Sequence, residues 1–375
     1  MTSEWNYSTI NDVCVLVTDG SHSSPKSVHD GEYMVSVKDF TDYGFDFSSC
    51  RMISHDDYEV LKRNGCVPQI DDILIGKDGA RFFEDIIIYR QREKPALLSS
   101  IAILRCDKSK ILPDFLYYAL RTPSFKQDVK DNYGSGSAIP RIILKDFKRM
   151  MVSYPSLEKQ RSIISVLTAI DSKIQANTEI NDNLQQQAQA IYSSMFIDNP
   201  DPAWSHGHLS DLITVKYGKD HKKLADGIYP VYGSGGIMRY VERPLYNKES
   251  VLIPRKGTLN NVMYVNQPFW SVDTMFYTEM KLPNVAKFVY HFVKAKDLAS
   301  MNAGSAVPSM TTDILNAMEV VIPSASALEE FESLVAPMYE AMEANDVQSK
   351  ALSQMRDTLL PKLMSGKIDV SSVQL

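Results

Sequence analysis

Three charged residues in the second half of the chain have the types and spacing of a metal-dependent nuclease site. In the segment VDTMFYTEMKL, Asp273 is followed by Glu279 and then by Lys281. On one face of a strand, two carboxylates could bind a divalent cation and the lysine could stabilise the charge that develops on a phosphate. Because so short a pattern also arises by chance, the alternative is an ordinary strand with charged surface residues.

No other part of the sequence matches a familiar catalytic or cofactor site. A DNA amino-group methyltransferase needs a Pro-Pro turn to hold the flipped base, and the chain has no Pro-Pro dipeptide, no GxSxG and no HExxH. The segment around Gly76-Lys77 does not form a P-loop motif. That motif requires a glycine at position 71 and a serine or threonine at position 78, and the chain has Asp71 and Asp78 there. The four cysteines form no CxxC pair, so neither a zinc site nor a disulfide framework is indicated.

Glycine-rich loops with polar and basic side chains are the better candidates for binding, and DNA is the ligand that they suit. They are GKDGARF, YGSGSAIPR, VYGSGGIMRY and PRKGTLNN. Glycine lets a backbone approach a partner closely, arginine pairs with guanine, asparagine pairs with adenine, and serine and lysine hold phosphates. The alternative is hairpin turns with solvated charges. The predicted DNA contacts are Lys77, Arg81, Ser135, Ser137, Arg141, Tyr232, Gly233, Ser234, Gly235, Arg239, Arg255, Lys256, Asn260 and Asn261.

The composition is that of a soluble protein with two or three domains. The chain has 375 residues, of which 44% are hydrophobic and 23% charged, and its net charge is −6. This charge does not itself predict nucleic-acid binding, which would require Lys and Arg to gather on one face. No segment approaches the ~18 apolar residues of a membrane span and the start resembles no export signal, so we expect a cytoplasmic protein without membrane contact.

A long internal repeat indicates a duplicated domain. The segment GSAIPRIILKDFKRMMVSYPS at 136–156 returns 168 residues later as GSAVPSMTTDILNAMEVVIPS. Solenoid repeats are only ~20 to 50 residues long, so a repeat at a distance of 168 residues indicates a duplicated domain and not a solenoid. Shorter similarities, such as ILIGKDG with VLIPRKG, occur in the same order in both halves. Short β-rich runs (DDILIG, IIIYR, SSIAILR) and a helix that begins after Pro113 indicate α+β domains.

Each repeat is followed by a heptad pattern without glycine, which predicts a helix of ~40 residues and ~60 Å. Two such helices in one chain most economically pair with each other, antiparallel. Pro337 suggests that the second helix starts later than the first, and Arg356 interrupts its apolar pattern. The predicted seam residues are Ile163, Leu167, Ile170, Ile174, Asn177, Leu184, Ile191, Phe331, Met338, Asn345, Leu352 and Leu359.

The predicted fold class is therefore α+β, with two duplicated α+β domains joined by two long antiparallel helices that form a coiled coil with pseudo-twofold symmetry. The predicted segments are 1–156 for the first domain, 157–197 for the first helix, 198–324 for the second domain, and 325–375 for the second helix and C-terminal tail.

In these features the chain resembles the DNA specificity subunits of type I restriction-modification systems. The resemblance covers nearly the whole length and is carried by YPVYGSGGI, ILIGKDGARF, GSAIPRIILKDF, the helix start at 155–174 and LLPKLMSGKID. It implies that the globular parts are target recognition domains, each reading one half of a split site in double-stranded DNA. It also implies that the helices act as a spacer between them.

The resemblance further implies a protein without catalysis or a cofactor of its own. Two modification subunits, which are methyltransferases, would dock on the helices and bind S-adenosylmethionine, and restriction subunits would add ATP- and magnesium-dependent translocation and cleavage. Two alternatives stay open: the specificity subunit of a bifunctional, type IIB-like restriction enzyme, and a nuclease built on Asp273, Glu279 and Lys281.

Overall fold

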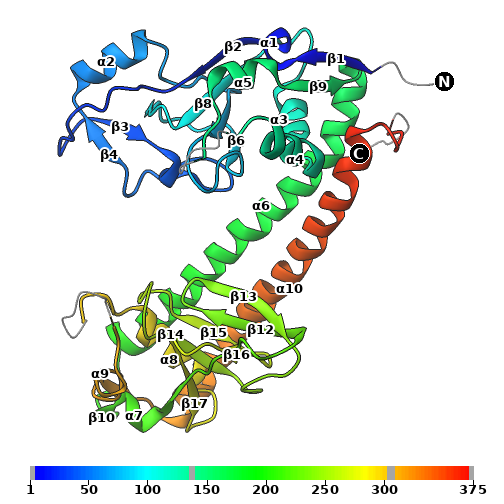
Figure 1. The fold of residues 1–375 in the computed structure, drawn as a ribbon. Coiled ribbons are helices and arrows are strands. Elements are labelled where there is room, and N and C mark those ends of the chain that lie inside the picture. Colours follow the sequence, from blue (N-terminus) through cyan, green and yellow to red (C-terminus); the bar gives the residue numbers. More distant parts are fainter. Residues whose placement is uncertain (1–4, 135–139, 302–308, 371–375) are drawn as a thin grey trace. The chain divides into compact units, whose positions relative to one another are not determined.

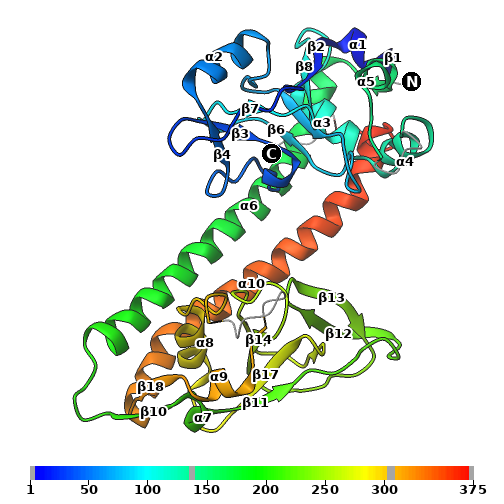
Figure 2. The ribbon, with the colours of Figure 1, turned by 60° about the vertical axis from the view of Figure 1, so that its left-hand side comes forward.

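The computed structural model describes residues 5–134, 140–301 and 309–370 (Figures 1 and 2). It divides into two compact units, one formed by residues 1–175 with 348–375 and the other by residues 176–347. The units differ from the four predicted segments because each unit includes part of both long helices. Ser135 and Ser137, two of the predicted DNA contacts, lie outside the described residues.

The first unit is built from short strands and short helices. Its strands are β1 (Asn6–Thr9), β2 (Cys14–Asp19), β3 (Glu32–Val35), β4 (Arg51–Ile53), β5 (Ile73–Gly76), β6 (Ile86–Ile88), β7 (Ala96–Leu97), β8 (Ile101–Cys106) and β9 (Met151–Tyr154). Its short helices are α1 (Ile10–Val13), α2 (His55–Arg63), α3 (Pro113–Arg121), α4 (Pro123–Asn132) and α5 (Leu144–Arg149). The strands predicted in DDILIG, IIIYR and SSIAILR and the helix predicted after Pro113 are thereby confirmed.

The second unit has the same elements in the same order, except that its described residues contain no helix equivalent to α2 or α4. Its strands are β10 (Ser205–His208), β11 (Ile213–Tyr217), β12 (Asp226–Gly233), β13 (Gly236–Val241), β14 (Ser250–Pro254), β15 (Met263–Val265), β16 (Trp270–Ser271), β17 (Met275–Met280) and β18 (Glu319–Ile322). Its short helices are α7 (Leu209–Leu212), α8 (Ala286–Lys294) and α9 (Thr312–Asn316).

The sheets of the two units have the same topology, which confirms the duplicated α+β fold. The four-stranded sheets have the orders β2-β8-β5-β6 and β11-β17-β14-β15, and the three-stranded sheets β4-β3-β7 and β13-β12-β16. Even single hydrogen bonds repeat. The N–H of Ile10 donates to the carbonyl of Met150, and the N–H of Leu209 donates to that of Met318, each at 2.8 Å.

Two long helices, α6 (Leu157–Ser193) and α10 (Ala325–Met364), follow the two repeats. Their starts are 168 residues apart, so the prediction of a later start for the second helix is wrong. The reason is an equivalent serine: the Ser156 hydroxyl accepts from the N–H of Lys159, and the Ser324 hydroxyl accepts from that of Ala327. This capping sets both starts, and α10 continues through Pro337.

The long helices run antiparallel beside each other within each unit. In the second unit, the Asn177 amide donates to the carbonyl of Asn345 at 3.3 Å, and the Asn345 amide donates to Oδ1 of Asn181 at 2.8 Å. In the first unit, Arg356 of α10 donates to Oδ1 of Asp171 of α6 at 2.9 Å. This ion pair explains why a charged residue interrupts the apolar pattern of α10.

The twelve predicted seam residues are all buried or half-buried. They do not all pack helix against helix, however. Ile163 and Leu167 belong to the hydrophobic core of the first unit, and Phe331 belongs to that of the second. The seam residues near the globular parts therefore fix the helices to the domains.

The helices of the described residues include none with the length and apolar character of a membrane span.

Candidate nucleic-acid interface

The loops that follow β5 and β14 have the same construction in the two units. Gly79 and Gly257 occupy equivalent positions with φ of 93° and 87°, a left-handed conformation that residues with a side chain rarely adopt. The N–H of Ile142 donates to the carbonyl of Lys77 at 3.0 Å, and the N–H of Met310 donates to that of Arg255 at 2.9 Å. Each glycine turn is thus fastened to the repeated segment of its own domain.

In the first unit, the predicted contacts differ sharply in exposure. Arg81 is on the surface, where its guanidinium group binds Asp85 at 2.7 Å. Arg141 is also exposed. Lys77 is buried, and its ammonium lies 3.4 Å from Asp19 and 3.5 Å from Asp78. The prediction of Lys77 as a DNA contact therefore needs correction, because its charge is neutralised inside the domain.

In the second unit, the turn between β12 and β13 meets the loop after β14. The Asn261 amide donates to the carbonyl of Ser234 at 2.8 Å. A Cβ atom at Gly257 would lie 2.6 Å from the Ser234 hydroxyl, so a side chain there would force Ser234 to shift. The structure thereby brings together Ser234, Gly235 and Asn261 with the exposed Lys256. Of these, Gly235 has open space beside it.

Four other predicted contacts of the second unit have structural roles. Tyr232 is buried and accepts a hydrogen bond from Gln267, and Gly233 packs against Met238. The guanidinium group of Arg239 binds the carbonyl of Leu224 and the carboxylate of Asp226. Both ends of the Asn260 amide are used: its nitrogen donates to Asp297 and its oxygen accepts from the N–H of Ala299. These side chains shape the loops rather than present free groups to a ligand.

Arg255 is half-exposed, so part of its side chain could contact DNA. One of its nitrogens donates to the carbonyl of Asp273 at 3.2 Å, and its guanidinium carbon lies 5.4 Å from the centre of the Tyr217 ring. This contact holds the guanidinium group beside an aromatic face at the half-exposed edge of the sheet.

The nuclease arrangement is not formed. Strand β17 begins at Met275, so Asp273 lies in the preceding turn and not on the strand with Glu279. The Glu279 carboxylate lies 3.7 Å from Lys216, and the ammonium of Lys281 donates to the carbonyl of Ser210. Among the described residues, no group of three or more His, Cys, Asp or Glu side chains is placed to hold a metal ion.

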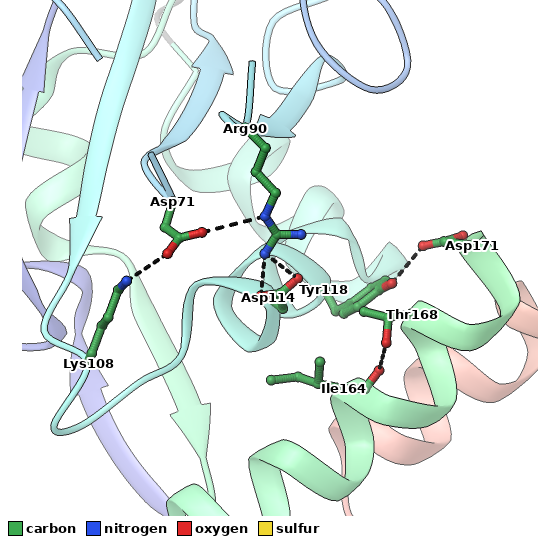
Figure 3. Close-up of polar contacts among 8 residues, drawn as sticks. All are labelled: Asp71, Arg90, Lys108, Asp114, Tyr118, Ile164, Thr168 and Asp171. Carbon is green, nitrogen blue, oxygen red and sulfur yellow. Dashed lines mark hydrogen bonds and ion pairs between the residues drawn. The ribbon is translucent and has the colours of Figure 1, made fainter. Parts of the chain in front are cut away.

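An ion network that the sequence did not reveal positions helix α3 in the first unit (Figure 3). Arg90 binds both carboxylate oxygens of Asp114 at 2.9 and 2.7 Å, and it lies 3.5 Å from Asp71. Asp71 also accepts from Lys108 at 2.6 Å, and this bond is the main cause of the lowered pKa of its carboxyl group. Asp71 has a φ of 72°, so the residue that excludes a P-loop forms a tight turn instead.

Equivalent polar contacts attach the domain helices to the long helices. In the first unit, the Tyr118 hydroxyl of α3 donates to Asp171 of α6 at 2.7 Å, as Figure 3 shows. In the second unit, His291 of α8 is hydrogen-bonded through Nδ1 to Gln189 of α6 at 2.8 Å and through Nε2 to the Tyr339 hydroxyl of α10 at 2.9 Å. His291 is fully buried, and this burial lowers its pKa to about 4.

The buried His291 predicts a stability loss in mild acid. In the unfolded chain the pKa of this imidazole is about 6.5. Below this pH the imidazole is therefore protonated in the unfolded state but stays neutral in the folded state. The contribution is fully present above pH ~6.5, falls as the pH drops towards about 4, and amounts to roughly 3 kcal/mol. Urea unfolding at several pH values between 4 and 8 measures it. The comparison is with His291→Gln, whose free energy of unfolding should depend less steeply on pH in this range. Equal pH dependence of the two proteins would contradict the role given to His291.

A family model described as type I restriction modification DNA specificity domain matches residues 2–186 and 203–331. The chain is 24% identical over 310 residues to the MjaIX specificity subunit of Methanocaldococcus jannaschii, covering 71% of each chain. It is 21% identical over 373 residues to the HindI specificity subunit of Haemophilus influenzae, covering 69% of this chain and 78% of the relative. Both relatives are named as parts of type I restriction enzymes.

A solved structure has the same fold. The crystal structure of the type I restriction-modification S subunit from M. genitalium aligns with a TM-score of 0.59 at 17% sequence identity. The alignment covers 96% of each chain, so the likeness extends over both domains and both long helices.

Proposed function

Because the chain belongs to the type I restriction-modification DNA specificity family, we propose that each of its domains reads one half of a split DNA site. One observation carries this proposal. The loops after β5 and β14 share a positive-φ glycine and the same backbone hydrogen bonds, but they present different side chains. A single framework with two sets of side chains is what two different half-sites require.

The exposed groups on these loops suggest how each half-site is contacted. In the first domain, Arg81 and Arg141 are placed to bind guanine edges or phosphates. In the second domain, Lys256 would bind a phosphate, while Ser234 and Gly235 allow the backbone to approach the DNA closely.

The partners would assemble on the long helices. Ile180 of α6 and Leu334, Val347 and Met355 of α10 are exposed apolar residues, which often mark a protein interface. We propose two modification subunits as the partners there, with restriction subunits joining them. S-adenosylmethionine, ATP and magnesium would then belong to these subunits, in agreement with a sequence that has neither a Pro-Pro turn nor a P-loop.

The two alternative functions are not favoured. The relatives belong to type I systems, which speaks against a bifunctional enzyme that cuts on both sides of its site. A nuclease would need Asp273, Glu279 and Lys281 on one strand face, but strand β17 runs from Met275 to Met280 and includes neither Asp273 nor Lys281.

The test is to co-express the chain with its modification subunit and map methylated adenines across a genome. We expect a motif with two specified halves and an unspecified spacer. Lys256→Ala removes one phosphate contact, so affinity for the DNA site should fall about tenfold and depend less steeply on salt. The motif itself should stay the same.

The matched control is Lys248→Ala, another exposed lysine of the second domain that lies outside the glycine loops. It should bind DNA like the unmodified chain. Methylation of a continuous motif, or no dependence of methylation on this chain, would contradict the proposed function. Equal affinities of the two variants would contradict the role of the β14 loop.

A further inference from the structure

The second unit contains a cavity of about 380 Å³ that is lined by several acidic and aromatic side chains. Four tyrosine rings line it: Tyr232, Tyr264, Tyr290 and Tyr339. Along α10 it is lined by four carboxylates, which are Glu332, Glu340, Glu343 and Asp346. Tyr232 is the one predicted DNA contact in this lining, and it is buried, so the exposed groups of the glycine loops lie outside the cavity.

The cavity has one cationic group, and that group is already used. Lys287 is buried, and its ammonium lies 2.5 Å from Glu332 and 3.3 Å from Glu249. It also lies over the rings of Tyr264 and Tyr339, at 5.2 and 5.5 Å from their centres. The site therefore already holds one ammonium between carboxylates and tyrosine faces.

The other three carboxylates have no such partner. The ion pairs found among the described residues include none to Glu340, Glu343 or Asp346. Asp346 accepts from the Asn181 amide at 2.8 Å, but burial and the nearby Glu343 raise its pKa. Like charges crowded on one helix face oppose each other, so a positively charged occupant would stabilise this arrangement.

We propose that this cavity receives an arginine side chain of the modification subunit. A guanidinium group suits it, because it stacks on aromatic faces and forms paired hydrogen bonds with carboxylates. DNA does not suit it, because phosphates would meet four carboxylates. The inference rests on the proposed function, in which modification subunits dock on the long helices.

A protein partner fits better than a free small cation because the acidic row continues into an apolar residue. One face of α10 carries, at helical spacing, Ala336, Glu340, Glu343 and Val347. Val347 is 65% exposed. A docked subunit would cover this side chain and neutralise the carboxylates together, whereas a small cation would do only the second.

The test compares the affinity of the full chain and its variants for the purified modification subunit. The double variant Glu343→Gln with Asp346→Asn keeps the shape and the hydrogen bond to Asn181, and it should bind about tenfold more weakly, with a smaller salt dependence. The single variant Glu340→Gln should show a smaller loss. The control is Glu329→Gln with Glu330→Gln, the same charge change at exposed positions of α10 outside the cavity, which should bind normally.

The outcomes separate this inference from the proposed function. Equal affinity of the cavity variant and the unmodified chain would overturn the cavity assignment alone. Failure of the unmodified chain to bind the modification subunit would refute the proposed function instead, and the cavity assignment with it. Binding of spermidine that depends on Glu343 and Asp346, with subunit binding unchanged, would assign the cavity to a small cation and overturn the proposal.

Discussion

A chain that lacks residues 174–180 of α6 and 342–348 of α10 should direct methylation to a motif with a shorter spacer. Each deletion removes one heptad, or about 10 Å of helix, so the spacer should lose about three base pairs. Both half-site sequences should stay the same, because the glycine loops are untouched. The measurement is the genome-wide map of methylated adenines, in which the original motif should disappear and the shortened one replace it.

The design of these deletions follows from the helix contacts. In the second unit Asn177 faces Asn345, its equivalent in the repeat, so the two deletions are centred on residues that lie side by side. Seven residues preserve the heptad phase of the seam. The control deletes only 177–180 and 345–348, which breaks this phase and should abolish methylation. An unchanged spacer in the heptad variant would show that the helices do not set the distance between half-sites.

The duplication could be predicted from the sequence because it is written in local and periodic signals. The repeated segments and the heptads can both be recognised along the chain without knowledge of distant contacts. The start of α10 is not delayed by Pro337, although that residue suggests it. The Ser324 cap and the buried side chains of Leu328 and Phe331 fix the first turns of the helix ahead of this proline.

The roles of single loop residues could not be predicted, because they depend on contacts between distant segments. Lys77 is a plausible phosphate ligand until the fold places it beside Asp19. Asn260 has the right amide to read adenine, but both ends of that amide hold the segment around Asp297. The sequence shows Arg356 as an exception to the heptad pattern, but it does not show that the partner, Asp171, lies on the other helix.

Phe331→Ala should strongly destabilise the second unit. The side chain is fully buried on α10 in a cluster of aromatic rings. Its ring centre lies 5.2 Å from that of Phe196, 6.2 Å from that of Tyr192 and 5.9 Å from that of His291. Truncation leaves a cavity among rigid rings that cannot close it, so the free energy of unfolding should fall by about 3 to 5 kcal/mol. Urea unfolding followed by the fluorescence of Trp204 and Trp270 measures it.

The matched control is Leu334→Ala on the same helix. Leu334 is 47% exposed, so its truncation should cost less than about 1 kcal/mol. Phe331→Leu should recover part of the loss, because it refills some of the cavity with apolar atoms. Phe331 packs α10 against Tyr192 of α6 and His291 of α8. Its truncation should therefore also weaken the packing of the domain against both long helices. If Phe331→Ala were no less stable than the control, the seam would not anchor the domain through this cluster.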